Sequence, residues 1–170
     1  MPLGELFLKG TAWLGLLAWA ASEWRRRSSP PASAGEREAR GALTAGGLAL
    51  LAHSALAFHL RYGWSQEAAQ QDTARQTEAV TGLAFGGGLF VNYAFLALWA
   101  VEIFWWWRAP VAYRGRAAAL DWSVRAFFLF MFVNGAIVFA HGPVRVVGTL
   151  ATLAVAWAWY RGAGAEGVHG

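Results

Sequence analysis

The chain has 170 residues, of which 57% are hydrophobic and 14% are charged, and it contains no cysteine. About a quarter of the residues of an ordinary soluble domain are charged, so this composition argues against a soluble protein. The lack of cysteine excludes disulfides, iron–sulfur clusters and thiolate metal sites. The excess of basic residues comes with no nucleic-acid-binding motif, so no nucleic-acid partner is expected. The length indicates one domain covering residues 1–170.

Five apolar runs follow one another along the chain. They cover residues 6–24, 41–61, 80–107, 117–140 and 144–160. A helix needs about 20 such residues to cross a bilayer, and the runs lack the period-two alternation of strands. We therefore expect an all-α integral membrane protein, a bundle of five transmembrane helices. Four spans are the alternative, because Ala18-Trp19-Ala20 resembles a signal-peptide cleavage site. The basic block after the first run favours a retained helix.

The connections between the runs predict the orientation. Arginines are concentrated in the first and third connections, at positions 25–27, 37, 40, 108, 114 and 116. The second connection is mainly acidic. The positive-inside rule then predicts an external amino terminus and a cytoplasmic carboxyl terminus, in a multi-pass protein of a cell membrane of the bacterial inner-membrane type. The Pro/Ser-rich residues 28–40 are expected to be a flexible linker, and residues 65–79 an outer helix leading into the third run.

Two charges lie inside the third and fourth runs. Glu102 and Arg125 fall at similar depths near the cytoplasmic ends of neighbouring antiparallel helices, which predicts an ion pair. Asp121 lies one helical turn from Arg125 and can share it. Such a pair fixes helix register, although simple extension toward the interface or a proton or ion relay are alternatives.

A second group of polar residues lies within the spans. It comprises His53, Asn92, Tyr93 and Asn134. Hydrogen bonds between helices are a common use of such residues in membranes. A ligand pocket is the alternative interpretation.

Two histidines, His59 and His141, lie at the outer ends of the second and fourth runs. Imidazoles at matching depth on different helices can hold a b-type haem or a metal ion, and Arg61 and Arg145 at the same level could meet the propionates of a haem. The competing interpretation is that each histidine simply faces lipid headgroups. His53 lies six residues from His59 and points in another direction, so those two cannot bind one ion together.

No catalytic motif of known spacing occurs in the sequence, so an enzyme is not expected. Glycines at 46–47, 82 and 86–88 predict close helix contacts. Our leading hypothesis is a small non-catalytic subunit or accessory component of a larger membrane assembly, with the bilayer and other membrane subunits or further copies of the chain as partners. The alternatives are a haem-binding electron-transfer or quinone-linked subunit, and a small transporter or channel.

Overall fold

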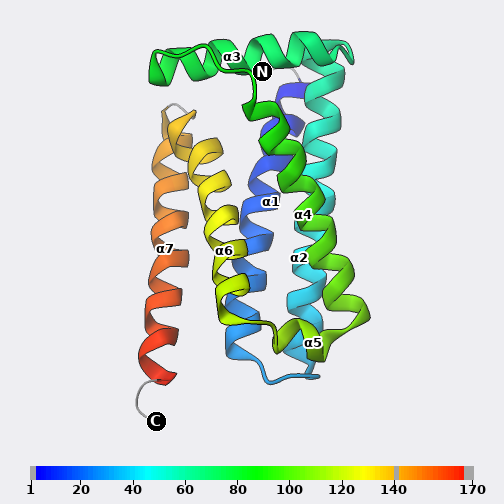
Figure 1. Cartoon of the computed structure of the whole chain (residues 1–170), viewed down its shortest axis with the longest axis vertical. Coiled ribbons are helices and arrows are strands. Elements are labelled where there is room, and N and C mark those ends of the chain that lie inside the picture. Colours follow the sequence, from blue (N-terminus) through cyan, green and yellow to red (C-terminus); the bar gives the residue numbers. More distant parts are fainter. Residues whose placement is uncertain (1–2, 140–141, 167–170) are drawn as a thin grey trace.

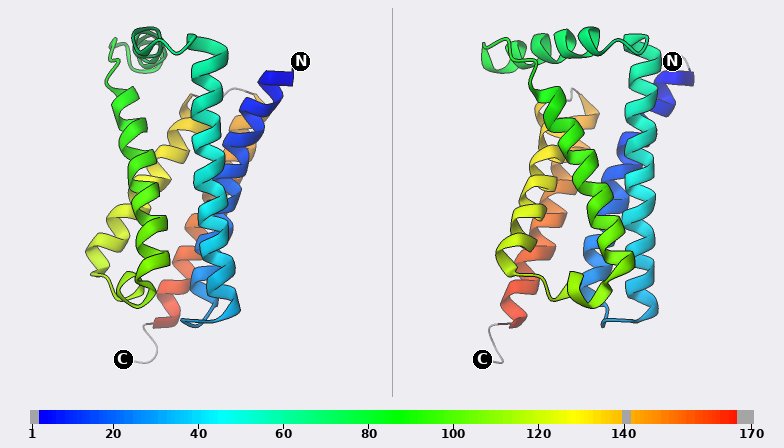
Figure 2. Two further views of the ribbon diagram at one scale, coloured as in Figure 1. Left: turned by 90° about the vertical axis from the view of Figure 1, so that its right-hand side faces the viewer. Right: turned by 45° about the vertical axis from the view of Figure 1, so that its right-hand side comes forward.

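A computed structural model describes residues 3–139 and 142–166, and every regular element in these ranges is helical. The long helices are α1 (Leu3–Ser28), α2 (Ala34–Ala57), α4 (Gly88–Arg108), α6 (Ala118–Val133) and α7 (Pro143–Glu166). They run along the long axis of the molecule, while α3 (Gln66–Thr81) lies across one end (Figure 1; Figure 2). Short helix α5 (Pro110–Arg114) lies at the opposite end. We name these the α3 end and the α5 end.

Within residues 3–139 and 142–166, three helices are long and apolar enough to cross a membrane. They are Ala34–Tyr62, Gly88–Arg108 and Ala118–Val138. Helix α7 contains a shorter apolar stretch, Arg145–Trp157, and α1 has Lys9 and Glu23 within its apolar stretch. The prediction of a helical protein is confirmed, and these three apolar helices are compatible with a membrane location.

Two of the long helices end in π-helical turns at the α3 end of the bundle. Helix α2 continues as η1 (Phe58–Tyr62), and α6 continues as η2 (Asn134–Val138). Gly63 follows η1 with φ of 53°, a left-handed conformation that glycine adopts at little cost. The chain therefore turns sharply from α2 toward α3.

Helix α3 is separate from the third apolar run, although we expected residues 80–107 to form one span. Gly82, with φ of 77°, ends α3, and α4 begins only at Gly88. The intervening residues pass close to α3, where a Cβ on Gly86 would lie 2.8 Å from the backbone oxygen of Gln70. The prediction of one continuous helix was wrong because the glycines allow a left-handed turn and a close backbone contact.

The linker predicted at 28–40 is mostly helical. Helix α1 extends to Ser28, and α2 begins at Ala34. The Ser33 hydroxyl caps α2 by accepting from the Glu36 backbone N–H at 3.2 Å, and the Glu36 carboxylate accepts from the Ala32 N–H. This arrangement resembles a capping box, in which a serine and the glutamate three residues later satisfy N–H groups at the helix start. The connection is therefore short and ordered.

Aromatic side chains from several helices form the core. Trp19 of α1, Trp99 of α4 and Phe128 and Phe132 of α6 are buried. The ring centroids of Trp99 and Phe128 lie 4.8 Å apart, and those of Trp19 and Phe132 lie 5.0 Å apart. This packing joins α6 to α1 and α4 and positions the polar residues near the α5 end.

Candidate functional site

A network of buried charged residues occupies the α5 end of the bundle. Its members come from α1, α4, α5, the α5–α6 connection and α6: Glu23, Arg26, Glu102, Tyr113, Arg116, Asp121 and Arg125. We call it the ionic network. It holds three arginines and three carboxylates, so its formal charges cancel. Segments far apart in the sequence meet here.

Glu102 is bound from two sides. Arg116 Nη1 donates to both of its carboxylate oxygens at 2.7 Å, and the Tyr113 hydroxyl donates to Oε2 at 2.8 Å. The side chains of Arg116 and Glu102 are only 3% and 5% exposed. A short charge-assisted contact away from water is strong and directional. It ties α4 to the connection that leads into α6.

Asp121 is shared by three arginines. Arg26 Nη2 approaches its two oxygens at 2.7 and 2.8 Å, and Arg116 Nη2 approaches Oδ1 at 2.6 Å. Arg125 Nη1 lies 3.1 Å from Oδ2. One carboxylate therefore joins α1 to α6 and to the α5–α6 connection.

Glu23 completes the network on α1. Its Oε2 lies 3.0 Å from Arg125 Nε, and its Oε1 lies 3.8 Å from Arg26 Nε. Breaking such a buried pair is costly because it leaves an uncompensated charge away from water. The network therefore stabilises one arrangement of α1, α4 and α6.

The two members outside the long helices keep fixed protonation states. Burial raises the pKa of the Tyr113 hydroxyl, and Glu102 raises it further, while Arg26 and Arg116 oppose the change. Burial lowers the pKa of the Arg116 guanidinium, but its contacts with Glu102 and Asp121 outweigh that effect and raise it overall. Tyr113 thus stays a hydrogen-bond donor and Arg116 stays a cation.

Aromatic rings cover the ionic network. Trp106 stacks on Tyr113 with centroids 4.8 Å apart and planes at 12°. The Arg116 guanidinium lies 4.3 Å from the centroid of Tyr113 on a ring face, a cation–π contact. Trp106 Nε1 also donates to the buried Glu36 carboxylate at 3.0 Å. The rings exclude water and strengthen the electrostatic contacts beneath them.

The predicted ion pair between Glu102 and Arg125 is not found among the ion pairs of the described residues. Glu102 pairs with Arg116, whereas Arg125 pairs with Asp121 and Glu23. Arg116 and Arg125 both contact Asp121. The contact between Asp121 and Arg125 was expected, because the two residues lie four apart on one helix. Sequence reasoning missed Arg116, Glu23 and Arg26, because no local spacing relates a connection or α1 to α4 and α6.

The four residues predicted as a polar cluster lie in different surroundings. Asn134 Nδ2 donates to the Phe130 carbonyl on its own helix at 2.8 Å, and Asn92 is exposed. His53 Nδ1 lies 2.8 Å from the Leu8 carbonyl of α1, and the Tyr93 hydroxyl donates to Gln66 of α3 at 2.6 Å. The last two contacts join helices, as one interpretation predicted, but the four residues do not form one site.

Three of the four residues considered for haem lie in the part of the chain that the structure describes. His59 is exposed on η1, and His141 lies outside the described residues.

Both arginines expected to meet haem propionates have other partners. Arg61 Nη2 lies 3.1 Å from both Glu5 oxygens. Arg145 Nε donates to the Ile137 carbonyl at 2.8 Å, which holds the end of η2 against the start of α7. Each therefore ties two neighbouring elements together.

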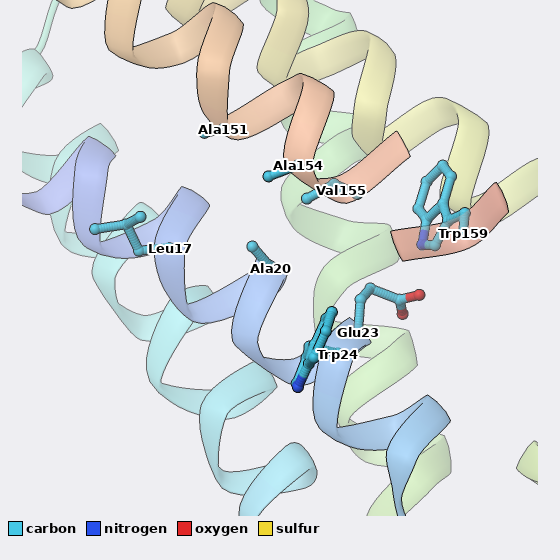
Figure 3. Close-up of a pocket in the computed structure, with 8 residues that line it drawn as sticks. All are labelled: Leu17, Ala20, Glu23, Trp24, Ala151, Ala154, Val155 and Trp159. Carbon is cyan, nitrogen blue, oxygen red and sulfur yellow. The ribbon is translucent and has the colours of Figure 1, made fainter. Parts of the chain in front are cut away.

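A groove of about 200 Å³ lies between α1 and α7. Its lining residues, labelled in Figure 3, are Leu17, Ala20, Glu23, Trp24, Ala151, Ala154, Val155 and Trp159. Three of them are alanines, so the two helices leave an apolar hollow between them. Glu23 belongs to both the groove and the ionic network. The buried Trp159 Nε1 has no hydrogen-bond partner among the described residues.

In the described part of the chain, no group of three His, Asp or Glu residues is placed to hold a metal ion. A scan against protein-family models, a search of curated proteins and a search of solved structures found no match to this chain. Function is therefore inferred from the ionic network and the α1–α7 groove themselves.

Proposed function

We propose that the chain is a five-span integral membrane protein that serves as a non-catalytic subunit of a larger membrane assembly. Helices α1 and α7 supply the two further spans. They have 26 and 24 residues, which correspond to about 39 and 36 Å at about 1.5 Å per residue, longer than a hydrocarbon core of about 30 Å. Both run beside the three apolar helices and expose large apolar side chains, among them Leu6 and Leu14 of α1 and Leu150 and Leu153 of α7. Lipid is the solvent that suits such surfaces.

The orientation follows from the arginines. Those at 25, 27, 37, 40, 108 and 114 belong to the α5 end, whereas α3 carries three acidic residues and one arginine. The positive-inside rule puts the α5 end in the cytoplasm and α3 outside.

Because the chain has no cysteine, single introduced cysteines report this orientation cleanly. We compare Ala34→Cys at the α5 end with Ala79→Cys on α3, since both alanines are exposed. In intact cells, an impermeant maleimide should label the cysteine at 79 and leave the one at 34 unmodified. After lysis both should react. If only the cysteine at position 34 were labelled in intact cells, the protein would have the opposite orientation.

The pairing of every carboxylate in the ionic network with an arginine of the same network supports a non-catalytic role. Its carboxylates are engaged by arginines at 2.6 to 3.8 Å, and its formal charges cancel. A network of this kind holds helices in one arrangement, because movement of any charge would leave another unpaired. We assign it to fixing the shape of the subunit.

The α1–α7 groove is the surface that we assign to the partner. Alanines at 20, 151 and 154 let another backbone approach, as small residues do where transmembrane helices associate. A transmembrane helix of another subunit, or of a second copy of this chain, fits an apolar hollow open to lipid.

Photo-crosslinking tests this assignment. A photoreactive phenylalanine analogue is introduced at Leu17, which lines the groove, or at Leu51 on α2 as the matched control, with exposures of 55% and 57%. We expect one discrete cross-linked protein from position 17 and only lipid adducts from position 51. A product of twice the chain mass would identify a homo-oligomer.

A variant with a larger side chain in the α1–α7 groove provides a second test. Ala154→Leu should reduce the cross-link from position 17 by about tenfold, which corresponds to about 1.4 kcal/mol, without lowering the thermal unfolding temperature. Equal cross-linking from both positions would contradict the proposal. So would a purified monomer that turns over a substrate unaided.

A further inference from the structure

A second hollow, of about 290 Å³, lies at the α5 end beside the start of α2. It is lined by Pro31, Ala32, Glu36, Arg37, Arg40, Pro110 and Val111. These residues come from the α1–α2 connection, α2 and α5, which lie close together at that end of the bundle (Figure 1). We call it the α2–α5 pocket. It is separate from the α1–α7 groove.

The two arginines of this pocket are free to bind an anion. Arg37 is exposed, and neither its guanidinium nor that of Arg40 makes an ion pair within residues 3–139 and 142–166. The Arg40 guanidinium lies 4.9 Å from the centroid of the Trp107 ring, and its Nε is buried with no hydrogen-bond partner. A planar guanidinium held over an aromatic ring presents its N–H groups in a fixed fork that matches a phosphate.

The acidic residue of the pocket, Glu36, is buried and already engaged by other donors. The Glu36 side chain is fully buried, and its oxygens already accept hydrogen bonds from Trp106 Nε1 and from the Ala32 N–H. With two arginines and one glutamate, the lining carries a formal charge of +1.

Apolar side chains extend from the pocket along α2 and α4. Trp107, Phe104 and Leu48 are exposed, and Trp107 Nε1 donates to Thr44 of α2 at 3.0 Å. Val111 of the pocket is 85% exposed. A ligand bound through the arginines would therefore have an apolar surface beside it for hydrocarbon chains.

We propose that the α2–α5 pocket binds the phosphate of an anionic phospholipid whose acyl chains lie along α2 and α4. This inference rests on the membrane location proposed above. The arginines recognise the phosphate, the exposed apolar side chains of α2 and α4 contact the acyl chains, and Trp107 lies at the boundary between headgroup and hydrocarbon.

Native mass spectrometry of the full-length protein in a neutral detergent tests the site. Phosphatidylglycerol and phosphatidylcholine with identical acyl chains are added in equal amounts, and the ratio of the two bound lipids is measured. Each guanidinium near an anionic headgroup strengthens binding by about fivefold, so two of them predict a preference of about 25-fold for phosphatidylglycerol.

Matched variants separate the site from general charge. Arg37→Gln and Arg40→Gln should each lower the preference about fivefold. Arg25→Gln should leave it unchanged, although it removes the same charge from the same end, because Arg25 does not line the pocket and pairs with Glu38 at 3.2 Å. Equal losses in Arg40→Gln and Arg25→Gln would overturn the proposal.

Three further comparisons test whether the variants fold, which ligand is bound and whether the protein lies in a membrane. Arg37 is exposed, and its side chain forms no ion pair within residues 3–139 and 142–166, so Arg37→Gln tests the site even if Arg40→Gln does not fold. Glycerol 3-phosphate at the lipid concentration should not displace the lipid, and displacement would show that the ligand is a free phosphate compound and not a phospholipid.

Carbonate extraction of membranes is run in parallel and tests the membrane location. Loss of the protein from membranes contradicts the proposed function, whereas a retained protein without lipid preference contradicts this inference alone.

Discussion

Glu102→Gln should destabilise the protein by about 3 kcal/mol or more, because it leaves the buried Arg116 charge without one of its two carboxylates. Arg116 donates to both Glu102 oxygens at 2.7 Å, and the pair is almost fully buried. Glutamine keeps the shape of the side chain, so the loss reports on charge. Thermal or denaturant unfolding in detergent, followed by tryptophan fluorescence, measures the change.

A double-mutant cycle then identifies the partner of Glu102. The double variant Glu102→Gln/Arg116→Gln should be more stable than the sum of the two single losses predicts, by at least about 1 kcal/mol. The corresponding cycle with Arg125→Gln should show a smaller coupling, because Arg125 contacts Asp121 and Glu23 instead.

An exposed ion pair provides the matched control for this prediction. Glu38→Gln removes the partner of Arg25, whose side chain is 3.2 Å away and 56% exposed. Exposed pairs contribute between about 0 and 1 kcal/mol, so this variant should change stability little. Similar losses for Glu38→Gln and Glu102→Gln would show that burial of the ionic network has no energetic consequence.

Gly46→Val should destabilise the bundle by about 3 kcal/mol, because three helices meet at this glycine. A Cβ at position 46 would lie 2.9 Å from Trp99 Cζ2, 3.2 Å from the Ala18 Cβ and 3.2 Å from the Gly15 carbonyl oxygen. The tryptophan is buried and its Nε1 donates to the Leu43 carbonyl at 2.9 Å, so it cannot move without losing that bond.

The same helix offers a control for that substitution. Gly41 lies five residues before Gly46, and a Cβ there would meet nothing within 4 Å. Gly41→Val should therefore change stability by no more than about 0.5 kcal/mol. The unfolding curves of both variants under identical conditions give the comparison, and equal losses would show that the cost does not come from the close packing around Gly46.

Composition and apolar length by themselves predict a helical protein with helices long enough to cross a membrane. The runs at 41–61, 80–107 and 117–140 overlap the three helices able to cross a membrane, because helix formation over about 20 apolar residues depends mainly on local sequence. The boundaries were less predictable. Glycine permits several backbone conformations, and only the contact of Gly86 with Gln70 shows why α4 begins at Gly88.

In the candidate site, too, the sequence predicts some of the features and only the tertiary structure decides the others. Sequence spacing identified Glu102, Arg125 and Asp121 as buried or shared charges, because a charge within an apolar run must find a partner and residues four apart on a helix are neighbours. It could not identify Arg116 as the partner of Glu102, since that choice depends on how the α5–α6 connection folds back beneath α4. Long-range pairing is a property of helix packing, and only the tertiary structure decides which of several arginines reaches each carboxylate.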